Sequence, residues 1–300
     1  MPQIKNWITA FRPRTLPLAL ASIGLGGFLA AFDGHFDWII FFLASLTTLF
    51  LQILSNLSND YGDAIHGADH EHRKGPKRAV QAGIISRDNM RKAIIIVTLL
   101  SLASGYELLK FSMGTASTAF WIFLLMGIAA IWAAVKYTAG KNPYGYAGLG
   151  DLSVVIFFGF LGVAGSYYLF TGSFKPTILL PALSIGLLAT AVLNINNIRD
   201  IESDKIAGKM TIPVRVGKKN AVRYHWALLS IALISALIFT IITYRSPYQY
   251  IFLISVPAII YNAISVERRQ GANEIDPLLK QMAMTSLLFV LSFGLGLLIN

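Results

Sequence analysis

The sequence predicts an all-α integral membrane protein, and three observations carry that prediction. Of its 300 residues, 55% are hydrophobic and 13% are charged, which is roughly half the charge of a soluble domain. The mean hydropathy is +0.61. The apolar residues gather into nine stretches, and about 20 apolar residues suffice for one membrane helix. This composition argues against a soluble enzyme, a disordered chain and a coiled coil.

The nine predicted membrane helices follow one another with connections that alternate in length. The connections after the first, third, fifth and seventh stretches are short, and those after the second, fourth, sixth and eighth are longer. We therefore expect one polytopic domain over residues 1–300. In chain order, the stretches cover residues 15–32, 38–58, 88–106, 116–135, 149–171, 177–198, 221–244, 248–266 and 278–299.

Strict alternation of the helices separates the basic residues by side. It gives 22 of the 25 Lys and Arg residues to one face, and leaves Lys110, Lys175 and Arg245 for the other. The positive-inside rule then predicts a multi-pass membrane protein with a cytoplasmic N-terminus and an external C-terminus. Cleavage of the first stretch as a signal peptide, the alternative interpretation, would break this alternation.

The cytoplasmic face also holds 12 of the 15 carboxylates, which positive-inside bias does not explain. This excess of acidic residues is the first indication of a functional site. The net charge of +10 is accounted for by the topology, so we expect a lipid bilayer and no nucleic acid as partner. The chain contains no Cys, which excludes disulfides and thiol catalysis.

The end of the second stretch carries the first acidic cluster. Asn56, Asn59, Asp60 and Asp63 stand at i, i+3, i+4 and i+7, a spacing that gives one face of a helix. Adjacent Asn59 and Asp60 would point about 100° apart on such a helix, so one of the two is a candidate for a supporting role.

The end of the sixth stretch carries a second cluster of the same kind. Asn196, Asp200 and Asp204 stand at i, i+4 and i+8, again on one helical face. Both clusters lie at the cytoplasmic end of an even-numbered predicted helix. The active site is therefore expected on two cytoplasmic loops, at about residues 59–87 and 199–220.

Facing carboxylates repel one another, and a divalent cation relieves that repulsion. Oxygen ligands without His or Cys suit Mg²⁺, which is commonly shared with substrate phosphates, so a diphosphate ligand is expected. Basic residues follow each cluster and could bind phosphate oxygens. The alternative is an ordinary charged loop with salt bridges. These basic candidates are Lys74, Lys77, Arg78, Lys209 and Arg215.

These residues resemble the intramembrane UbiA-type aromatic prenyltransferases, whose first motif reads Asn-Asp-x-x-Asp-x-x-x-Asp and whose second reads Asp-x-x-x-Asp. The matching segments begin at Asn59 and at Asp200. The third Asp of the first motif would fall at Gly67, and the next carboxylate is Asp69. Segments 12–17, 56–63 and 143–151 resemble the branch that acts on 1,4-dihydroxy-2-naphthoate in menaquinone synthesis.

The resemblance implies a UbiA-type bundle that transfers a polyprenyl group from its diphosphate to 1,4-dihydroxy-2-naphthoate with loss of CO₂. It also implies Mg²⁺ as cofactor, with polyprenyl diphosphate and the aromatic acceptor as partners. The expected metal ligands are Asn59, Asp60, Asp63, Asp69, Asp200 and Asp204. The expected catalytic residues are Asp60, Asp63, Asp200, Asp204 and Lys136; Asn56 and Asn197 join the basic residues as candidates for diphosphate binding.

Several individual roles stay open at this point. Arg12 and Arg14 either bind the acceptor carboxylate or anchor the first helix, and Lys136 either approaches the diphosphate or ends its helix at the interface. Asp151 either interacts with a helix dipole or orients an acceptor hydroxyl. Tyr137 and Tyr144 are further candidates for the acceptor subsite.

Two alternative functions are weighed against this one. A membrane transporter also uses intramembrane carboxylates, but its charges lie near the midplane and not at helix ends on one face. Within the family, 4-hydroxybenzoate or another aromatic compound is the alternative acceptor. Acceptor preference is the observation that would separate these possibilities.

Overall fold

The computed structural model describes residues 3–66 and 78–299. Within these two ranges all of the regular secondary structure is helical, and no strand is present. Nine of the described helical segments are long and apolar enough to cross a membrane, so the chain is a multi-pass membrane protein, as predicted. The segments are Ile4–Phe32, Trp38–Ile65, Arg87–Met113, Thr118–Lys136, Gly150–Thr171, Pro176–Arg199, Ile212–Ile242, Pro247–Arg268 and Ala272–Leu298.

Several of these segments are built from more than one helical element. In chain order the elements are α1 (Ile4–Phe11), η1 (Pro13–Thr15), α2 (Leu16–Phe32), α3 (Trp38–Ile65), α4 (Arg87–Met113), α5 (Thr118–Lys136), α6 (Gly150–Val154), η2 (Val155–Gly165), α7 (Ser166–Thr171), η3 (Pro176–Ile178), α8 (Leu179–Arg199), α9 (Ile201–Ile206), α10 (Ile212–Ile242), η4 (Pro247–Ser255), α11 (Val256–Arg268) and α12 (Ala272–Leu298).

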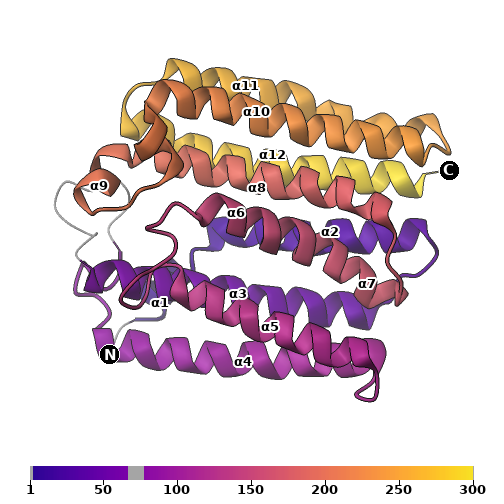
Figure 1. Cartoon of the computed structure of the whole chain (residues 1–300), viewed down its shortest axis with the longest axis horizontal. Coiled ribbons are helices and arrows are strands. Elements are labelled where there is room, and N and C mark those ends of the chain that lie inside the picture. The colour runs from indigo at the N-terminus through magenta and orange to yellow at the C-terminus, as the bar shows by residue number, and fades with distance from the viewer. Residues whose placement is uncertain (1–2, 67–77, 300) are drawn as a thin grey trace.

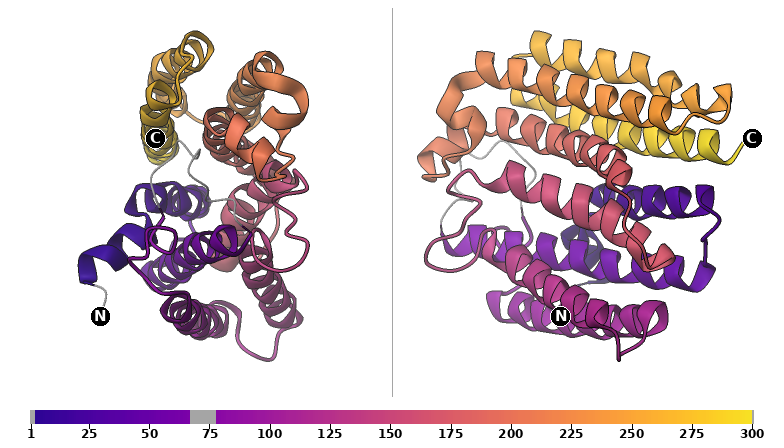
Figure 2. Two further views of the ribbon diagram at one scale, coloured as in Figure 1. Left: turned by 90° about the vertical axis from the view of Figure 1, so that its left-hand side faces the viewer. Right: turned by 45° about the vertical axis from the view of Figure 1, so that its right-hand side comes forward.

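The long helices lie side by side as an elongated bundle (Figure 1). Helices α3, α4 and α5 form one flank, α8, α10, α11 and α12 form the other, and α2 and α6–α7 lie between them (Figures 1 and 2). Short helix α9 marks one end of the bundle, which we call the α9 end, and the two chain termini lie at opposite ends (Figure 1). The other end is called the opposite end.

Local sequence signals set where the membrane helices begin. The Asp37 side chain accepts hydrogen bonds from the backbone N–H groups of Ile39 (2.7 Å) and Ile40 (3.1 Å), which caps α3. Ser86 and Ser117 cap α4 and α5 in the same way, through one backbone N–H each. Such caps satisfy backbone donors that the first helical turn leaves without partners.

The N-terminal helix α1 is a separate element and not an extension of α2. Arg12 ends α1 in the left-handed conformation (φ 53°, ψ 67°), which turns the chain before η1 and α2. The helix α1 therefore projects from the side of the bundle (Figure 2, left). Ile4 and Ile8 on α1 are exposed.

The structure corrects three boundaries of the predicted segments. Helix α3 continues to Ile65, so the segment expected as a loop from about residue 59 is helical at its start. The segment expected at 199–220 contains α9 and the first part of α10. Helix α10 begins at Ile212 and not near residue 221, and Gly217 kinks it with a φ of +77°. Polar helix ends carry no hydropathy signal, which explains these differences.

Close helix packing brings the end of α3 against the end of α5. A Cβ atom on Gly62 would lie 2.5 Å from the Thr138 carbonyl oxygen, so only glycine permits this approach. Thr138 donates a hydrogen bond to the Ser58 carbonyl oxygen (3.0 Å). This contact fixes the turn of α3 that carries the first acidic cluster.

Candidate active site

A cavity of about 920 Å³ runs through the bundle between its two flanks. At the α9 end it is lined by polar residues of both acidic clusters, including Asp63 and Asp200. Toward the opposite end its lining becomes apolar and includes Leu108, Leu124 and Leu169. The two clusters, 140 positions apart in sequence, are thus brought to one end of one cavity, as the sequence predicts.

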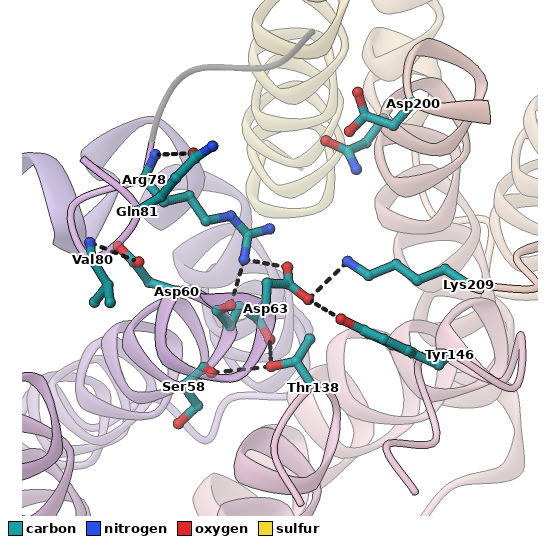
Figure 3. A network of polar contacts seen from close by, with 12 residues as sticks. Ser58, Asp60, Asp63, Arg78, Val80, Gln81, Thr138, Tyr146, Asp200 and Lys209 are labelled. Atoms are coloured by element: carbon teal, nitrogen blue, oxygen red, sulfur yellow. Dashed lines mark hydrogen bonds and ion pairs between the residues drawn. The ribbon is translucent and has the colours of Figure 1, made fainter. Parts of the chain in front are cut away.

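Asp63 is the centre of the polar network at this end (Figure 3). Its carboxylate is 1% exposed and forms ion pairs with Arg78 and with Lys209, whose Nζ lies 2.8 Å from Oδ1. The Tyr146 hydroxyl donates a 2.7 Å hydrogen bond to the same oxygen. Because a buried carboxylate is costly unless it is paired, these three partners stabilise its charge beside the cavity.

Asp60 lines the same cavity but faces a different partner. Its two carboxylate oxygens accept hydrogen bonds from the backbone N–H groups of Ala79 (3.0 Å) and Val80 (3.2 Å). The neighbouring Arg78 also donates to the Asn59 carbonyl oxygen. Asp60 therefore fixes the backbone at residues 79 and 80, next to Arg78, and so helps to place Arg78 beside Asp63.

The two asparagines of the first cluster connect it to other helices. The Asn59 side-chain oxygen accepts a hydrogen bond from the Thr138 hydroxyl (3.1 Å). Asn56 donates from Nδ2 to the Phe11 carbonyl oxygen (2.9 Å) and to the Thr15 hydroxyl (3.1 Å). Both asparagines line the cavity, and Asn56 also ties α3 to the turn between α1 and α2.

Asp200 lies across the site from Asp63 (Figure 3), and the neighbouring Arg199 holds its carboxylate. Arg199 donates from Nε (2.8 Å) and Nη2 (2.6 Å) to the two carboxylate oxygens. The same guanidinium group contacts Asp276 of α12 and the Asn196 side-chain oxygen. Planar, forked pairing of this kind orients a carboxylate as well as neutralising it.

The second cluster does not continue along one straight helix, which corrects the predicted geometry. Helix α8 ends at Arg199, Asp200 adopts a non-helical backbone (φ −100°, ψ 10°), and α9 begins at Ile201. Asn197, Asp200 and Asp204 nevertheless all line the cavity. The break changes the direction of α9 without removing Asp204 from the site.

The two predicted basic residues after the second cluster have different surroundings. Lys209 lines the cavity and lies over the Tyr146 ring, 4.8 Å from its centroid. Arg215 lies outside the cavity lining and donates to the carbonyl oxygens of Met210 (2.9 Å) and Ala147 (2.7 Å). Arg215 thus joins the two segments that carry Lys209 and Tyr146, and does not itself reach the cavity.

The candidates for the acceptor subsite also divide between the cavity and its surroundings. Arg12, Arg14, Tyr137 and Tyr144 line the cavity, and the two tyrosine rings meet edge to face with centroids 5.4 Å apart. Burial, with a contribution from the Asp151 carboxylate, raises the pKa of Tyr137. This phenol stays protonated at neutral pH and can donate a hydrogen bond.

Lys136 and Asp151 both lie outside the cavity lining. Lys136 is exposed at the end of α5, in agreement with the interfacial alternative. Asp151 is buried at the start of α6, where its carboxylate accepts a hydrogen bond from the Tyr224 hydroxyl (3.2 Å). Three further predicted residues, Asp69, Lys74 and Lys77, fall in the segment 67–77, which is outside the described residues.

Sequence reasoning missed several residues that shape this site. Tyr146 lies within segment 143–151 and was not singled out, and Thr138 follows the predicted fourth helix by a few residues. Arg199 belongs to the second cluster itself, so its adjacency to Asp200 was a usable signal. Asp276 is on α12, and no pattern in the sequence connected it with the site.

The donor set of the cavity fits a hard divalent cation. Oxygen donors from both clusters line the α9 end, and the described lining residues include no histidine. Among the described residues, no group of three or more His, Asp or Glu side chains already converges as a metal cage. Oxygen donors of this kind are the ligands that hard divalent cations take in proteins.

Comparisons with known proteins agree with this architecture. Residues 19–287 match the UbiA prenyltransferase family. A 1,4-dihydroxy-2-naphthoate octaprenyltransferase from Escherichia coli (strain K12) is 45% identical over 294 residues, covering 98% of this chain and 95% of the relative. A protein of the same name from Haemophilus influenzae is 47% identical over 300 residues, covering 99% and 97%.

Solved structures share the fold at low sequence identity. A UbiA homologue from Archaeoglobus fulgidus bound to DMAPP and Mg²⁺ is 18% identical, with a TM-score of 0.65, covering 98% of this chain and all of that chain. A UbiA homologue from Aeropyrum pernix K1 is 17% identical, with a TM-score of 0.70, covering 96% and 98%. The sequence match and the shared bundle agree, and the chain belongs to the UbiA prenyltransferase family.

Proposed function

We propose that this protein transfers an octaprenyl group from its diphosphate to 1,4-dihydroxy-2-naphthoate, with loss of CO₂, to give a demethylmenaquinol. One observation carries the proposal: both acidic clusters and two basic side chains meet at the polar end of a cavity that continues into an apolar channel. This layout suits a substrate with a charged head and a long hydrocarbon tail. The names of the two relatives from E. coli and H. influenzae support the same acceptor and tail.

The diphosphate would bind at the α9 end, close to Asp63. Arg78 and Lys209 now pair with this carboxylate, and both are suited to phosphate oxygens. Asn59, Asp60, Asp63, Asp200 and Asp204 would hold Mg²⁺, which would neutralise the diphosphate and stabilise the leaving group. Taking up that metal would release the two cations to pair with the substrate.

The chemical step requires only a change of bonding partners. The bond between the allylic carbon and the diphosphate oxygen breaks, and its electron pair leaves on the diphosphate. The naphthoate ring carbon that carries the carboxylate attacks the allylic carbon, and the bond to the carboxylate carbon then breaks to restore the aromatic ring and release CO₂. Arg78 and Lys209 would stabilise the negative charge that develops on the leaving group, an effect that lowers such barriers strongly.

The acceptor would bind inside the cavity, next to the charged residues at the α9 end. Tyr137 and Tyr144 present aromatic surfaces there, which can stabilise a passing allylic cation. Arg12 and Arg14 are the basic residues we assign to the acceptor carboxylate, because they line the cavity. A protonated Tyr137 is suited to donate to a naphthol oxygen.

The topology of the proposed enzyme follows from its charges. We place the α9 end on the cytoplasmic side of a bacterial inner membrane, because 22 of the 25 basic residues are assigned to that face. Substrates made in the cytoplasm would then reach the polar mouth directly, while the tail would remain at the depth of the hydrocarbon core. Attaching a reporter enzyme to the external C-terminus would test this orientation.

The deciding experiment measures acceptor preference in the purified protein. Detergent-solubilised protein is given octaprenyl diphosphate and Mg²⁺ with either 1,4-dihydroxy-2-naphthoate or 4-hydroxybenzoate, and products are separated by chromatography. We expect prenylated naphthoquinol and stoichiometric CO₂ from the labelled carboxylate, with loss of both in EDTA. Product from 4-hydroxybenzoate alone would contradict the proposed acceptor, and product unaffected by EDTA would contradict the metal.

A further inference from the structure

One buried arginine, Arg199, is shared by two carboxylates at the α9 end. Its Nε and Nη2 atoms donate to the two carboxylate oxygens of Asp200, at 2.8 and 2.6 Å, and its Nη1 atom donates to Oδ1 of Asp276. Nη2 also donates to the side-chain oxygen of Asn196 at 2.8 Å. The Arg199 side chain is only 2% exposed, so these partners, and not water, stabilise its charge.

The two carboxylates differ in their access to the cavity. Asp200 lines the cavity, across the site from Asp63 (Figure 3). Asp276 belongs to α12 and lies outside the cavity lining, and 35% of its side chain is exposed. A ligand in the cavity can therefore contact Asp200 directly, whereas Asp276 influences such a ligand through Arg199.

The balance of charges explains what the second carboxylate does. The proposed metal takes Asp200 as one of its ligands, and a buried arginine that loses its counter-ion is strongly destabilising. With Asp276 in place, Arg199 keeps a carboxylate partner when Asp200 binds the cation. Without Asp276, Asp200 would be the one carboxylate paired with Arg199 among the described residues, and the metal would have to compete with the guanidinium group for it.

We propose that Asp276 is a positioning residue, which makes Asp200 available to the metal by holding Arg199. This inference rests on the proposed function, which supplies the cation and the diphosphate. Asp63 needs no such residue, because its partners Arg78 and Lys209 line the cavity and can pair with the diphosphate instead. The last membrane helix, α12, thereby contributes to the metal site without supplying a ligand.

The first test measures metal binding without turnover. Asp276→Asn removes the charge, and Asp276→Glu keeps it. The matched control is Glu274→Gln, which removes the other carboxylate of α12 but keeps an oxygen that can accept from the backbone N–H groups at the start of that helix. Each purified protein is dialysed to equilibrium against Mn²⁺ at a fixed concentration of inorganic pyrophosphate, and the excess Mn²⁺ on the protein side is measured.

Removing a group that orients a metal ligand typically weakens metal binding by about 10- to 100-fold. We therefore expect the Mn²⁺ concentration for half-saturation to rise about tenfold in Asp276→Asn, and to stay within about twofold in Asp276→Glu and Glu274→Gln. Unchanged binding in Asp276→Asn, or equal weakening in either of the other two variants, would overturn the proposal.

The second test is the metal dependence of turnover. In Asp276→Asn, the Mg²⁺ concentration for half-maximal rate should rise about tenfold, whereas kcat at saturating Mg²⁺ should stay within about twofold. A fall in kcat with an unchanged Mg²⁺ dependence would overturn the role of Asp276. Failure of the proposed function is visible before any variant is compared. If the unaltered protein forms no prenylated naphthoquinol, forms it in EDTA or retains no Mn²⁺, then that function or its metal is wrong, and the role of Asp276 is wrong with it.

Discussion

The two ends of the bundle hold nearly the same set of side chains around an aspartate. At the α9 end, Asp63 contacts an arginine, a lysine and a tyrosine: Arg78, Lys209 and Tyr146. At the opposite end, Asp33 has Lys175 at 2.8 Å, Arg245 at 4.0 Å and a 2.7 Å hydrogen bond from the Tyr167 hydroxyl. Composition alone would give the two clusters the same role.

Their surroundings make them different. Asp63, Arg78, Tyr146 and Lys209 line the cavity, and the Lys209 side chain is only 15% exposed. Asp33 lies outside the cavity lining, and its partner Lys175 is 52% exposed. Arg245 also packs over the Phe32 ring, 3.8 Å from its centroid. A charged cluster that lines a cavity can bind a ligand, whereas a cluster of the same composition outside the cavity only joins helix ends.

The sharpest test exchanges the two aspartates for asparagine. Asp63→Asn removes the charge that organises Arg78 and Lys209 and that would face the metal, so we expect kcat/KM to fall about 1,000-fold. Asp33→Asn is the matched change at the opposite end, and kcat/KM should stay within about twofold. The readout is prenylated naphthoquinol formed by purified protein. Equal activity losses in the two variants would show that the two ends of the bundle do not differ in their contribution to catalysis.

The lysines provide the second test. Lys209→Met keeps the alkyl chain over Tyr146 but removes the ammonium group, and we expect about a 100-fold loss in kcat/KM for prenyl diphosphate. Lys175→Met should leave the activity unchanged, because Lys175 is exposed and lies outside the cavity lining. Steady-state kinetics over a range of prenyl diphosphate concentrations measure both. Normal turnover by Lys209→Met would exclude Lys209 from leaving-group stabilisation.

Much of the fold was open to prediction because the bilayer imposes a simple pattern. Each of the nine apolar stretches corresponds to one described membrane segment. The polar ends of the helices were not predictable in the same way. The last two turns of α3, which carry Asn59, Asp60 and Asp63, have no apolar periodicity. The start of α10 before Gly217 has none either.

The residues of the site also fall into a group that the sequence could predict and a group that it could not. Carboxylates that gather at helix ends are conspicuous in an apolar sequence, so Asp63 and Asp200 could be found. The partner of a charge depends on tertiary packing, so the roles of Tyr146 and Asp276 could not. Arg215 shows the converse, because its basic side chain after an acidic cluster suggested phosphate binding, whereas it donates to backbone carbonyl groups.

The two tyrosines that donate to these aspartates are expected to have smaller effects. Tyr146→Phe removes one hydrogen bond to Asp63 but keeps the ring beneath Lys209, and a hydrogen bond of this kind corresponds to about a fivefold loss in kcat/KM. Tyr167→Phe removes the equivalent bond to Asp33. It should lower the free energy of unfolding by about 1 kcal/mol without affecting turnover. Steady-state kinetics and thermal unfolding in detergent are measured on both variants. Loss of turnover in Tyr167→Phe, or unchanged turnover in Tyr146→Phe, would contradict this assignment.

The smallest expected effect is a pH dependence of stability at the opposite end. Burial by itself raises the pKa of Asp33, but the hydrogen bonds from Lys175 and Tyr167 and the charges of Lys175 and Arg245 outweigh it, so the pKa is lowered overall. A carboxyl group whose folded pKa is depressed stabilises the fold above its unfolded pKa, about 3.9, and loses that contribution as pH falls through the folded value. The melting temperature of the unaltered protein should therefore exceed that of Asp33→Asn by a constant margin from about pH 7 to pH 5, and the margin should close below about pH 4. A margin that persisted or widened at pH 3 would show that the Asp33 charge is not what joins these helix ends.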